Sequence, residues 1–296
     1  MTGAQGDQAH QPELHGTGRL SGWVRSTIDR IAPLRSVVKS PLVQNLIYTA
    51  RVSRQVERPL AFVAGELRGE GTEAVVLRRS GLTANLRRGS GDLVMLHQII
   101  GRDVYRPPVE VSERLGRVEG PLRIADLGAN VGFFTLRQLE SYPGCEIVAV
   151  EADPGNAALL ARTLAANRLE PRVELVEAAA SNAPGSVEFA AGNFFESHVV
   201  EGDGGDGTIE VRMIDALPLL AGRHLVKIDI EGSEWPILAD PRFRELEAVA
   251  LTLEWHIQGC PGSEPRQAAE DALAAAGYTV RHDHSEPGCG TLWAWR

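Results

Sequence analysis

Two short apolar stretches of the chain each end in a carboxylate, and the first of them leads directly into a glycine-bearing turn. That stretch begins at Ile124, turns through Asp126-Leu-Gly-Ala-Asn-Val-Gly132, and continues as a helical pattern from Phe133 to Leu139. A strand, a tight turn and a helix in this order leave free backbone N–H groups at the helix N-terminus, and glycines let a ligand approach the main chain. The sequence therefore predicts a binding site for a nucleotide-like molecule at this turn.

The spacing of the glycines indicates which molecule this is. A dinucleotide turn reads G-x-G-x-x-G, whereas this turn has Gly128 and Gly132 with Asn130 between them. The preceding Asp126 is a poor neighbour for a pyrophosphate and a good one for a cationic donor that carries an amino group and a sulfonium. The second apolar stretch ends at Glu151, at about the 20-residue interval where an acidic side chain binds ribose hydroxyls. We therefore predict S-adenosylmethionine rather than NAD as the ligand.

Further ionisable residues follow the fourth and fifth predicted core strands. Lys227, Asp229 and Glu231 lie at period two and therefore point to the same side of the fourth strand. A buried lysine is costly unless it is paired, so we expect Lys227 to form an ion pair that orders the strand end, and Asp229 to position an acceptor. His256 is the first candidate for a base because its pKa lies near ambient pH, and Glu254 would orient its imidazole or bind the acceptor.

Four ordered motifs in the segment from about Leu82 to the C-terminus resemble the FkbM family of S-adenosylmethionine-dependent methyltransferases. This resemblance implies a class I methyltransferase fold and, in most members, O-methylation of small molecules, often natural products or sugars. The motifs are Asp126-Leu-Gly-Ala-Asn-Val-Gly-Phe-Phe-Thr135, Glu151-Ala-Asp-Pro154, Leu225-Val-Lys-Ile-Asp-Ile-Glu-Gly-Ser-Glu234 and Leu253-Glu-Trp-His256.

The resemblance also implies roles for individual residues. The methionine part of the donor would contact the glycine turn, the ribose would bind Glu151, and the adenine would pack on Ala152 and contact the residues that follow the third core strand. Phe134 and Val131 are expected in the core, and Asp92 and His97 at the entrance of the site, although Asp92 also suits a helix cap. The predicted cofactor-binding residues are Asp126, Gly128, Asn130, Gly132, Phe133, Glu151, Ala152, Glu177 and Ala178, and the predicted catalytic residues are His256, Glu254 and Asp229.

Several alternatives stay open at this point. Asp229, Glu254 and His256 offer ligands that suit Mg²⁺ beneath a sugar diol, but the family resemblance does not require a metal, and we predict no metal site. Carboxyl- or N-methylation would use the same donor site. A non-catalytic ligand-binding or scaffold module on the same fold, and a nicotinamide oxidoreductase, are the other classes considered.

The order of elements predicts an α/β fold: a mostly parallel seven-stranded sheet whose last strand is antiparallel, preceded by a helical region and a β-hairpin. Strands are expected at 122–127, 146–150, 173–177, 225–230, 249–254, 278–282 and 291–295, with helical patterns between most of them. The short connection around Ser285-Glu-Pro-Gly288 requires antiparallel pairing. We therefore assign residues 120–296 to a methyltransferase domain.

The region before this domain divides into two parts. Residues 1–19 are polar and without periodicity, which predicts a disordered tail. Residues 20–119 combine helical periodicity from Ser21 to Leu67 with a hairpin, Ala74–Arg78 and Leu82–Leu86. These helices are expected to cover the substrate side, form a homodimer contact or pack against the sheet edge. Two short strands, 186–190 and 208–212, are also predicted, and Asn193 to His198 between them is a candidate to reach over the substrate.

Composition limits the class of partner and the compartment. The formal net charge is -9 and the pI is about 5.5, which argues against a nucleic-acid partner. The three cysteines show no metal-binding spacing, no apolar run is long enough to span a bilayer, and the N-terminus lacks the pattern of a signal peptide. We expect a cytoplasmic enzyme that acts on a small-molecule acceptor, without a membrane or nucleic-acid partner.

Overall fold

The computed structural model of the protein describes residues 41–69, 71–190 and 208–296. The chain forms two compact units, Met1–Leu46 and Ile47–Arg296. Helix α3 (Pro41–Val52) contributes the described residues of the first unit, and all features discussed below belong to the second. The predicted disordered tail and the helical pattern around Trp23 lie outside the described residues.

A seven-stranded sheet in the order β11-β12-β10-β9-β3-β4-β5 forms the centre of the second unit. Its neighbouring strands are parallel except where β12 pairs with β10 and β11, so the mostly parallel sheet with an antiparallel last strand is confirmed. Several strand ends differ from prediction. β9 ends at Ile228, two residues early, whereas β10 continues to His256 and β11 to Glu286 because both pair with β12 over these residues. The strands are β3 (Arg123–Leu127), β4 (Glu146–Glu151), β5 (Val173–Glu177), β9 (Leu225–Ile228), β10 (Ala250–His256), β11 (Thr279–Glu286) and β12 (Cys289–Trp295).

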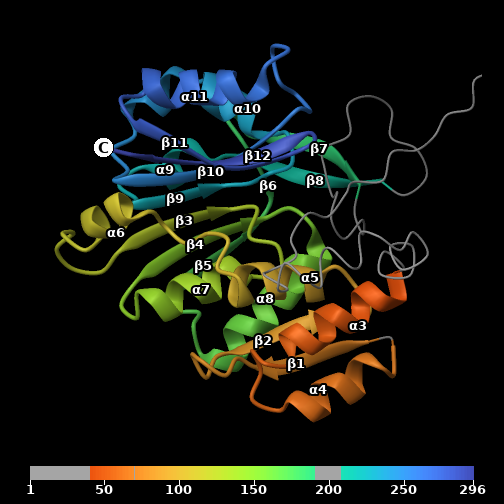
Figure 1. Ribbon diagram of the computed structural model, residues 1–296. Helices are drawn as coiled ribbons and strands as arrows, with labels where there is room; N and C mark the ends of the chain where they lie inside the picture. The colour runs from red at the N-terminus through yellow and green to blue at the C-terminus, as the bar shows by residue number, and fades with distance from the viewer. Residues whose placement is uncertain (1–40, 70, 191–207) are drawn as a thin grey trace, which may run out of the picture. The chain divides into compact units, whose positions relative to one another are not determined.

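Helices cover both faces of this sheet (Figure 1). Figure 1 shows α10 and α11 above the sheet and α7 and α8 below it. Alternate strand residues enter different cores: Ile124 packs with the α7 and α8 side, whereas Ala125 and Val226 pack with the α10 and α11 side. Burial on both faces explains why these strands read as continuous apolar runs. The covering helices are α6 (Val109–Leu115), α7 (Phe133–Ser141), α8 (Pro154–Asn167), α9 (Leu217–Leu220), α10 (Glu234–Ala239), η2 (Pro241–Glu245) and α11 (Pro265–Ala275).

The predicted β-hairpin is present and is hydrogen-bonded to helix α8. The backbone N–H of Thr83 donates to Asn167 Oδ1 at 2.8 Å, and that of Asn85 donates to Thr163 Oγ1 at 3.0 Å. Around the hairpin lie further short helices, of which the π-helix η1 continues directly from α5. The elements are α4 (Pro59–Glu66), β1 (Thr72–Val76), β2 (Thr83–Arg87), α5 (Asp92–Leu96) and η1 (His97–Gly101).

Asp92 does not cap helix α5, so that interpretation was wrong. The N-cap position is Gly91, without a side-chain cap hydrogen bond. The Asp92 carboxylate is buried and accepts bonds from the Nε, Nη2 and backbone N–H of Arg87 at 2.8–2.9 Å. It therefore fixes the end of the hairpin through a forked ion pair.

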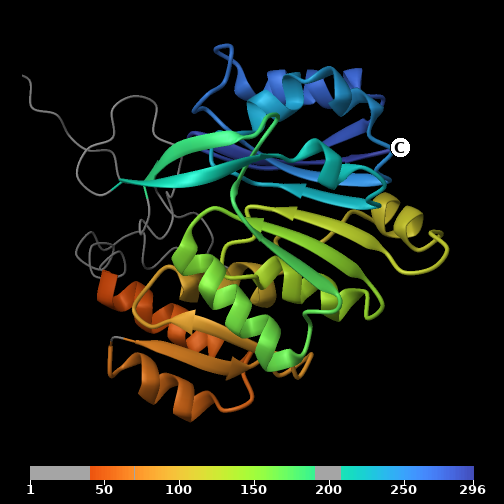
Figure 2. The same cartoon turned by 180° about the vertical axis from the view of Figure 1, so that it is seen from behind.

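A separate three-stranded sheet in the order β6-β8-β7 follows β5 along the chain (Figure 2). Its members are β6 (Ala179–Ser181), β7 (Gly185–Ala190) and β8 (Thr208–Asp215), so the two predicted short strands are present and a third is added. The segment from Asn193 to His198 and the glycine-rich run before β8 lie outside the described residues. Within the part of the chain that the structure describes, no helix has the length and apolar character needed to cross a bilayer.

Candidate functional site

A cavity of about 970 Å³, which includes open solvent, lies where β3, β4 and β9 end. Ligands of open α/β sheets bind at this edge, beyond the carboxyl ends of the strands. The residues that line it are Met95, Ile99, Tyr105, Gly128, Ala129, Asn130, Phe133, Phe134, Val150, Glu151, Ala152, Asn156, Ala178, Ala179, Ala180, Lys227, Asp229, Ile230, Glu231 and Ser233. We call the part formed by Gly128, Asn130, Glu151 and Asn156 the turn side, and the group Asp229, Glu231, Glu254 and His256 the acidic side.

The two glycines of the turn are required by packing within the protein. A Cβ on Gly128, whose φ is +78°, would collide with the backbone oxygen of Asp229, and one on Gly132, whose φ is +93°, would collide with Leu160. Gly128 lines the cavity, but Gly132 does not. The prediction that Gly132 admits a ligand to the main chain therefore gives way to a packing role against helix α8.

Asp126 is buried behind the cavity and does not line it, which corrects its predicted role as a direct neighbour of the ligand. Its carboxylate accepts the Thr135 hydroxyl at 2.7 Å and lies 3.4 Å from Lys227 Nζ. Lys227 also contacts Asp229 Oδ2 at 3.2 Å and donates to the backbone oxygen of Gly128 at 2.9 Å. The predicted buried ion pair of Lys227 is thus confirmed, and it joins the ends of β3 and β9.

On the turn side, the Glu151 carboxylate is held by three N–H donors. Oε2 accepts the backbone N–H of Asn130 at 2.7 Å, while Oε1 accepts that of Asp153 at 2.9 Å and Asn156 Nδ2 at 3.2 Å. Burial raises the pKa of Glu151, and the N–H groups of Asp153 and Asn130 counteract this effect. The donors therefore fix the carboxylate at the edge of the cavity.

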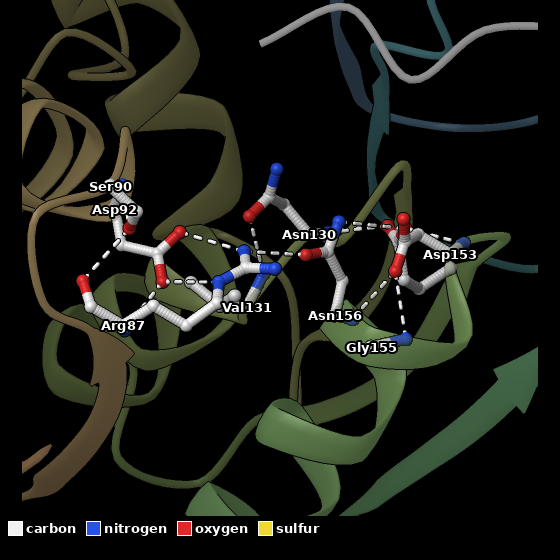
Figure 3. A network of polar contacts seen from close by, with 9 residues as sticks. Arg87, Ser90, Asp92, Asn130, Val131, Asp153, Gly155 and Asn156 are labelled. Atoms are coloured by element: carbon white, nitrogen blue, oxygen red, sulfur yellow. Dashed lines mark hydrogen bonds and ion pairs between the residues drawn. The ribbon is translucent and has the colours of Figure 1, made fainter. Parts of the chain in front are cut away.

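A polar network extends from this carboxylate to the hairpin (Figure 3). Figure 3 shows Arg87 between Asp92 and Asn156, with Asp153 beside Gly155 at the start of α8. Arg87 Nη2 donates to Asn156 Oδ1 at 2.7 Å and to Asp92 Oδ1 at 2.8 Å. The hairpin thus supports the residue that binds Glu151 directly.

The apolar wall of the cavity contains residues that were assigned to the donor site and others that were not. Phe133, Ala152 and Ala178 line the cavity as predicted. Phe134, which was expected in the core, also lines it and packs edge-on against Tyr105, with ring centroids 5.3 Å apart. Glu177, the last residue of β5, is exposed and does not line the cavity, so the structure does not place it at the predicted position. Ala178, the next residue, does line the cavity.

The acidic side brings the predicted catalytic residues together in a different arrangement. The Tyr105 hydroxyl donates to Asp229 Oδ2 at 2.8 Å and lies 3.4 Å from Glu254 Oε2. Asp229 lines the cavity, whereas Glu254 and His256 lie behind its lining residues. Glu231 occupies the position between His256 and the cavity, since its Oε2 is 3.3 Å from His256 Nε2 and its side chain is 40% exposed.

Glu234, and not Glu254, orients the His256 imidazole. The Glu234 carboxylate is fully buried, and its Oε1 accepts the backbone N–H of His256 at 2.7 Å and lies 3.3 Å from its Nδ1. Its Oε2 accepts the backbone N–H of Gly232 at 2.9 Å. The predicted role of Glu254 as the orienting carboxylate is therefore wrong, because the helix that follows β9 supplies a nearer one.

Crowding of charge shifts the pKa values on the acidic side. Burial, and then the Asp229 charge, raise the pKa of Glu231 to about 8 and that of Glu254 to about 7. Burial opposes the charged form of His256, but the bond to Glu234 and the charge of Glu231 outweigh it and raise its pKa to about 9. These groups therefore exchange protons near neutral pH, which suits acid–base chemistry.

Sequence reasoning missed three residues of the site for different reasons. Tyr105 comes from an irregular segment before α6, where no local pattern indicates that its hydroxyl reaches Asp229. Asn156 lies in the first turn of α8, five residues after Glu151, and the Asp-Pro start of that helix was a usable signal. Glu234 was part of a quoted motif, and its position one turn from a strand end on a short helix could have indicated its contact.

A protein-family model matches the part of the chain that contains most of the residues of the site. The model of the methyltransferase FkbM domain matches residues 126–279, just over half of the chain. A comparison with curated protein sequences gives no match.

Three solved structures, two of them of methyltransferases, are similar to this chain at low sequence identity. An FkbM methyltransferase from Methylobacillus flagellatus KT is 14% identical, with a TM-score of 0.45, over 88% of this chain and 60% of that chain. Precorrin-6y C5,15-methyltransferase from Geobacter metallireducens GS-15 is 17% identical, with a TM-score of 0.38, over 64% of this chain and 86% of that chain. TYW2 from M. jannaschii, in complex with AdoMet, is 11% identical, with a TM-score of 0.37, over 75% of this chain and 84% of that chain.

The family assignment depends on the match of the domain model, which includes the glycine turn, Glu151 and the whole acidic side. The chain belongs to the FkbM family of S-adenosylmethionine-dependent methyltransferases.

Proposed function

We propose that the protein transfers a methyl group from S-adenosylmethionine to a hydroxyl group of a small molecule. The observation that carries this proposal is one cavity lined both by a fixed carboxylate beside a glycine turn and by Glu231, whose pKa is raised by burial and by the Asp229 charge. The first suits the ribose of the donor, and the second suits an acceptor that must lose a proton.

The turn side fits the donor in its hydrogen-bonding capacity. Glu151 Oε2 accepts one N–H bond, from Asn130, which leaves a lone pair for a ribose hydroxyl. The small side chains of Ala152 and Ala178 leave space for a flat adenine, and Phe133 adds an apolar surface. Gly128 and Asn130 would hold the methionine part. These residues are therefore our assignment for donor binding.

The acidic side fits an acceptor hydroxyl. S-adenosylmethionine supplies a methyl group on a sulfonium, whose S–C bond breaks as a new O–C bond forms. Glu231 lines the cavity and is the group that takes the hydroxyl proton, while His256 behind it stabilises the carboxylate and Glu234 holds the ring. Asp229, fixed by Tyr105 and Lys227, orients the acceptor. The base assignment thus moves from His256 to the pair Glu231–His256.

Calorimetric titration with S-adenosylmethionine and NADH tests the donor assignment. We expect micromolar binding of S-adenosylmethionine, no binding of NADH, and at least about 100-fold weaker donor binding in Glu151→Ala, or about 2.7 kcal/mol, because a charged partner of the ribose is lost. Glu151→Gln keeps the size of the side chain and controls for misfolding. Unchanged donor binding in both variants would contradict the assignment.

The acceptor class is tested by a screen of alcohols, amines and carboxylic acids with mass spectrometry of the products. We expect products that gain one methylene unit on a hydroxyl oxygen. Methylation confined to nitrogen or to carboxylate oxygen would replace hydroxyl transfer with one of the alternative reactions on the same donor site.

A further inference from the structure

Three donor groups of the acidic side converge on one point beside the cavity. Asp229 and Glu231 follow β9, and His256 ends the adjacent parallel strand β10. One ligand atom from each residue lies within 4.8 Å of the other two. Two carboxylate oxygens and one imidazole nitrogen at such spacing match the coordination sphere of a divalent cation of the first transition series.

The hydrogen bonds of His256 determine which nitrogen faces this point. The ionised Glu234 carboxylate only accepts hydrogen bonds, so its Oε1, which also receives the backbone N–H of His256, faces Nδ1–H of the ring at 3.3 Å. His256 Nε2 faces Glu231 Oε2 at 3.3 Å. A protonated imidazole donates to this oxygen, and a divalent cation would displace that proton and bind both atoms. A buried carboxylate behind a histidine is also the arrangement that orients metal-binding imidazoles.

The third donor and the open side indicate a metal ion rather than a proton. The Asp229 oxygen Oδ2 is engaged by Tyr105 at 2.8 Å and by Lys227 at 3.2 Å, which leaves Oδ1 as the available ligand. A proton joins two atoms, whereas three convergent donors are suited to a larger cation. Asp229 and Glu231 both line the cavity, so the remaining coordination positions face the space assigned to the acceptor.

We propose that Asp229, Glu231 and His256 form a divalent metal site, with Mn²⁺ as its best-matched ion. Imidazole nitrogen and two carboxylates suit Mn²⁺ better than Mg²⁺, which prefers oxygen ligands and retained water. The site departs from the sequence-based expectation of no metal and replaces Glu254, the ligand considered there, with Glu231.

The role of this ion in catalysis rests on the proposed function. An acceptor with two neighbouring oxygens, such as a vicinal diol, would occupy two adjacent open positions of the ion. Coordination lowers the pKa of the bound hydroxyl. Glu231 can bind the ion through one oxygen and receive the hydroxyl proton on the other, so that the alkoxide oxygen is free to form the new O–C bond.

The test is an Mn²⁺ titration of the full chain, stripped with a chelator and followed by electron paramagnetic resonance of free Mn²⁺. We expect one saturable site per chain, with at least 10-fold weaker binding in Asp229→Asn, Glu231→Gln and His256→Gln. Glu254→Gln, on the same strand as His256, is the matched control and is expected to change the affinity less than about 3-fold. Spin-echo spectra of the bound ion should show nitrogen coupling that His256→Gln abolishes.

Absence of saturable binding by the wild-type chain would overturn the site and leave a proton shared by Glu231 and His256. Equal loss in Glu254→Gln would also overturn it, since binding would then reflect general negative charge. Circular dichroism of each variant verifies folding. Failure of the wild-type chain to bind S-adenosylmethionine would refute the proposed function without changing the Mn²⁺ result, so the two failures are distinguishable.

Discussion

The turn side and the acidic side of the cavity place carboxylates at equivalent strand ends but treat them in opposite ways. Glu151 receives three N–H donors, two of them from the backbone that follows β3 and β4. On the acidic side, the Glu231 carboxylate faces another acceptor, and Glu254 lies beside Asp229 at the Tyr105 hydroxyl. Fixed N–H donors hold the Glu151 carboxylate in one position, whereas burial and crowded carboxylates on the acidic side raise the pKa of Glu231 and Glu254.

The largest expected effect comes from removing the Lys227 ammonium, which neutralises the carboxylates of Asp126 and Asp229. Lys227→Met leaves the buried Asp126 and the partly buried Asp229 without their cation, so we expect the free energy of unfolding to fall by about 3–5 kcal/mol. Urea unfolding at neutral pH measures it. Adding Asp126→Asn should recover part of the loss; no recovery would show that packing around the lysine stem, and not charge, is responsible.

A smaller effect, dependent on pH, is expected from Glu234→Gln. The pKa of His256 is raised to about 9 in the folded protein, compared with about 6.5 in the unfolded chain. Protonated His256 therefore stabilises the fold in full below pH 6.5, and this contribution is lost as the pH rises through 9. Glu234 supplies much of the increase in this pKa. The free energy of unfolding of the wild type should therefore exceed that of the variant by about 1–3 kcal/mol at pH 6 and by less at pH 9. Unfolding in chelator-containing buffer at both pH values checks this. A pH-independent difference would contradict it.

On the turn side, Asn156→Ala should weaken donor binding by about 10-fold, or about 1.4 kcal/mol, because Glu151 and Arg87 each lose one hydrogen bond. Asn167→Ala is the matched control: it lies on the same helix and bonds the same hairpin, but it does not contact Glu151. Calorimetry of both variants measures the difference. An equal loss of affinity in the two variants would show that hairpin docking alone matters.

The smallest effect is expected from Glu177→Ala. Glu177 ends β5 as Glu151 ends β4, yet its exposed side chain does not line the cavity. Donor affinity should therefore stay within about 2-fold of wild type, or about 0.4 kcal/mol. A greater loss, measured in the same calorimeter cell, would restore the residue to the site.

The sequence predicted the sheet because its strands are buried on both faces and end at recognisable turns. It located Glu151 and Asp229 because residues that follow parallel strands must meet at one edge. It misplaced Asp126 because a strand residue's burial depends on the neighbour that faces it, here Lys227 in register on β9. The contact of Tyr105 with Asp229 could not be predicted, since it joins segments 124 residues apart without any local pattern.

The hydrogen bonds that anchor the β1–β2 hairpin to helix α8 link docking of the hairpin to ligand binding at Glu151. Arg87 connects the hairpin to Asn156, and Asn156 holds the carboxylate that we assign to the donor. Suppose that a ligand binds Glu151 more tightly when Asn156 holds it. Hairpin docking then strengthens ligand binding by a certain free energy, and ligand binding must stabilise the docked hairpin by the same free energy. Amide exchange at Thr83 and Asn85, whose N–H groups are bonded to side chains of α8, should consequently slow when the cavity is filled.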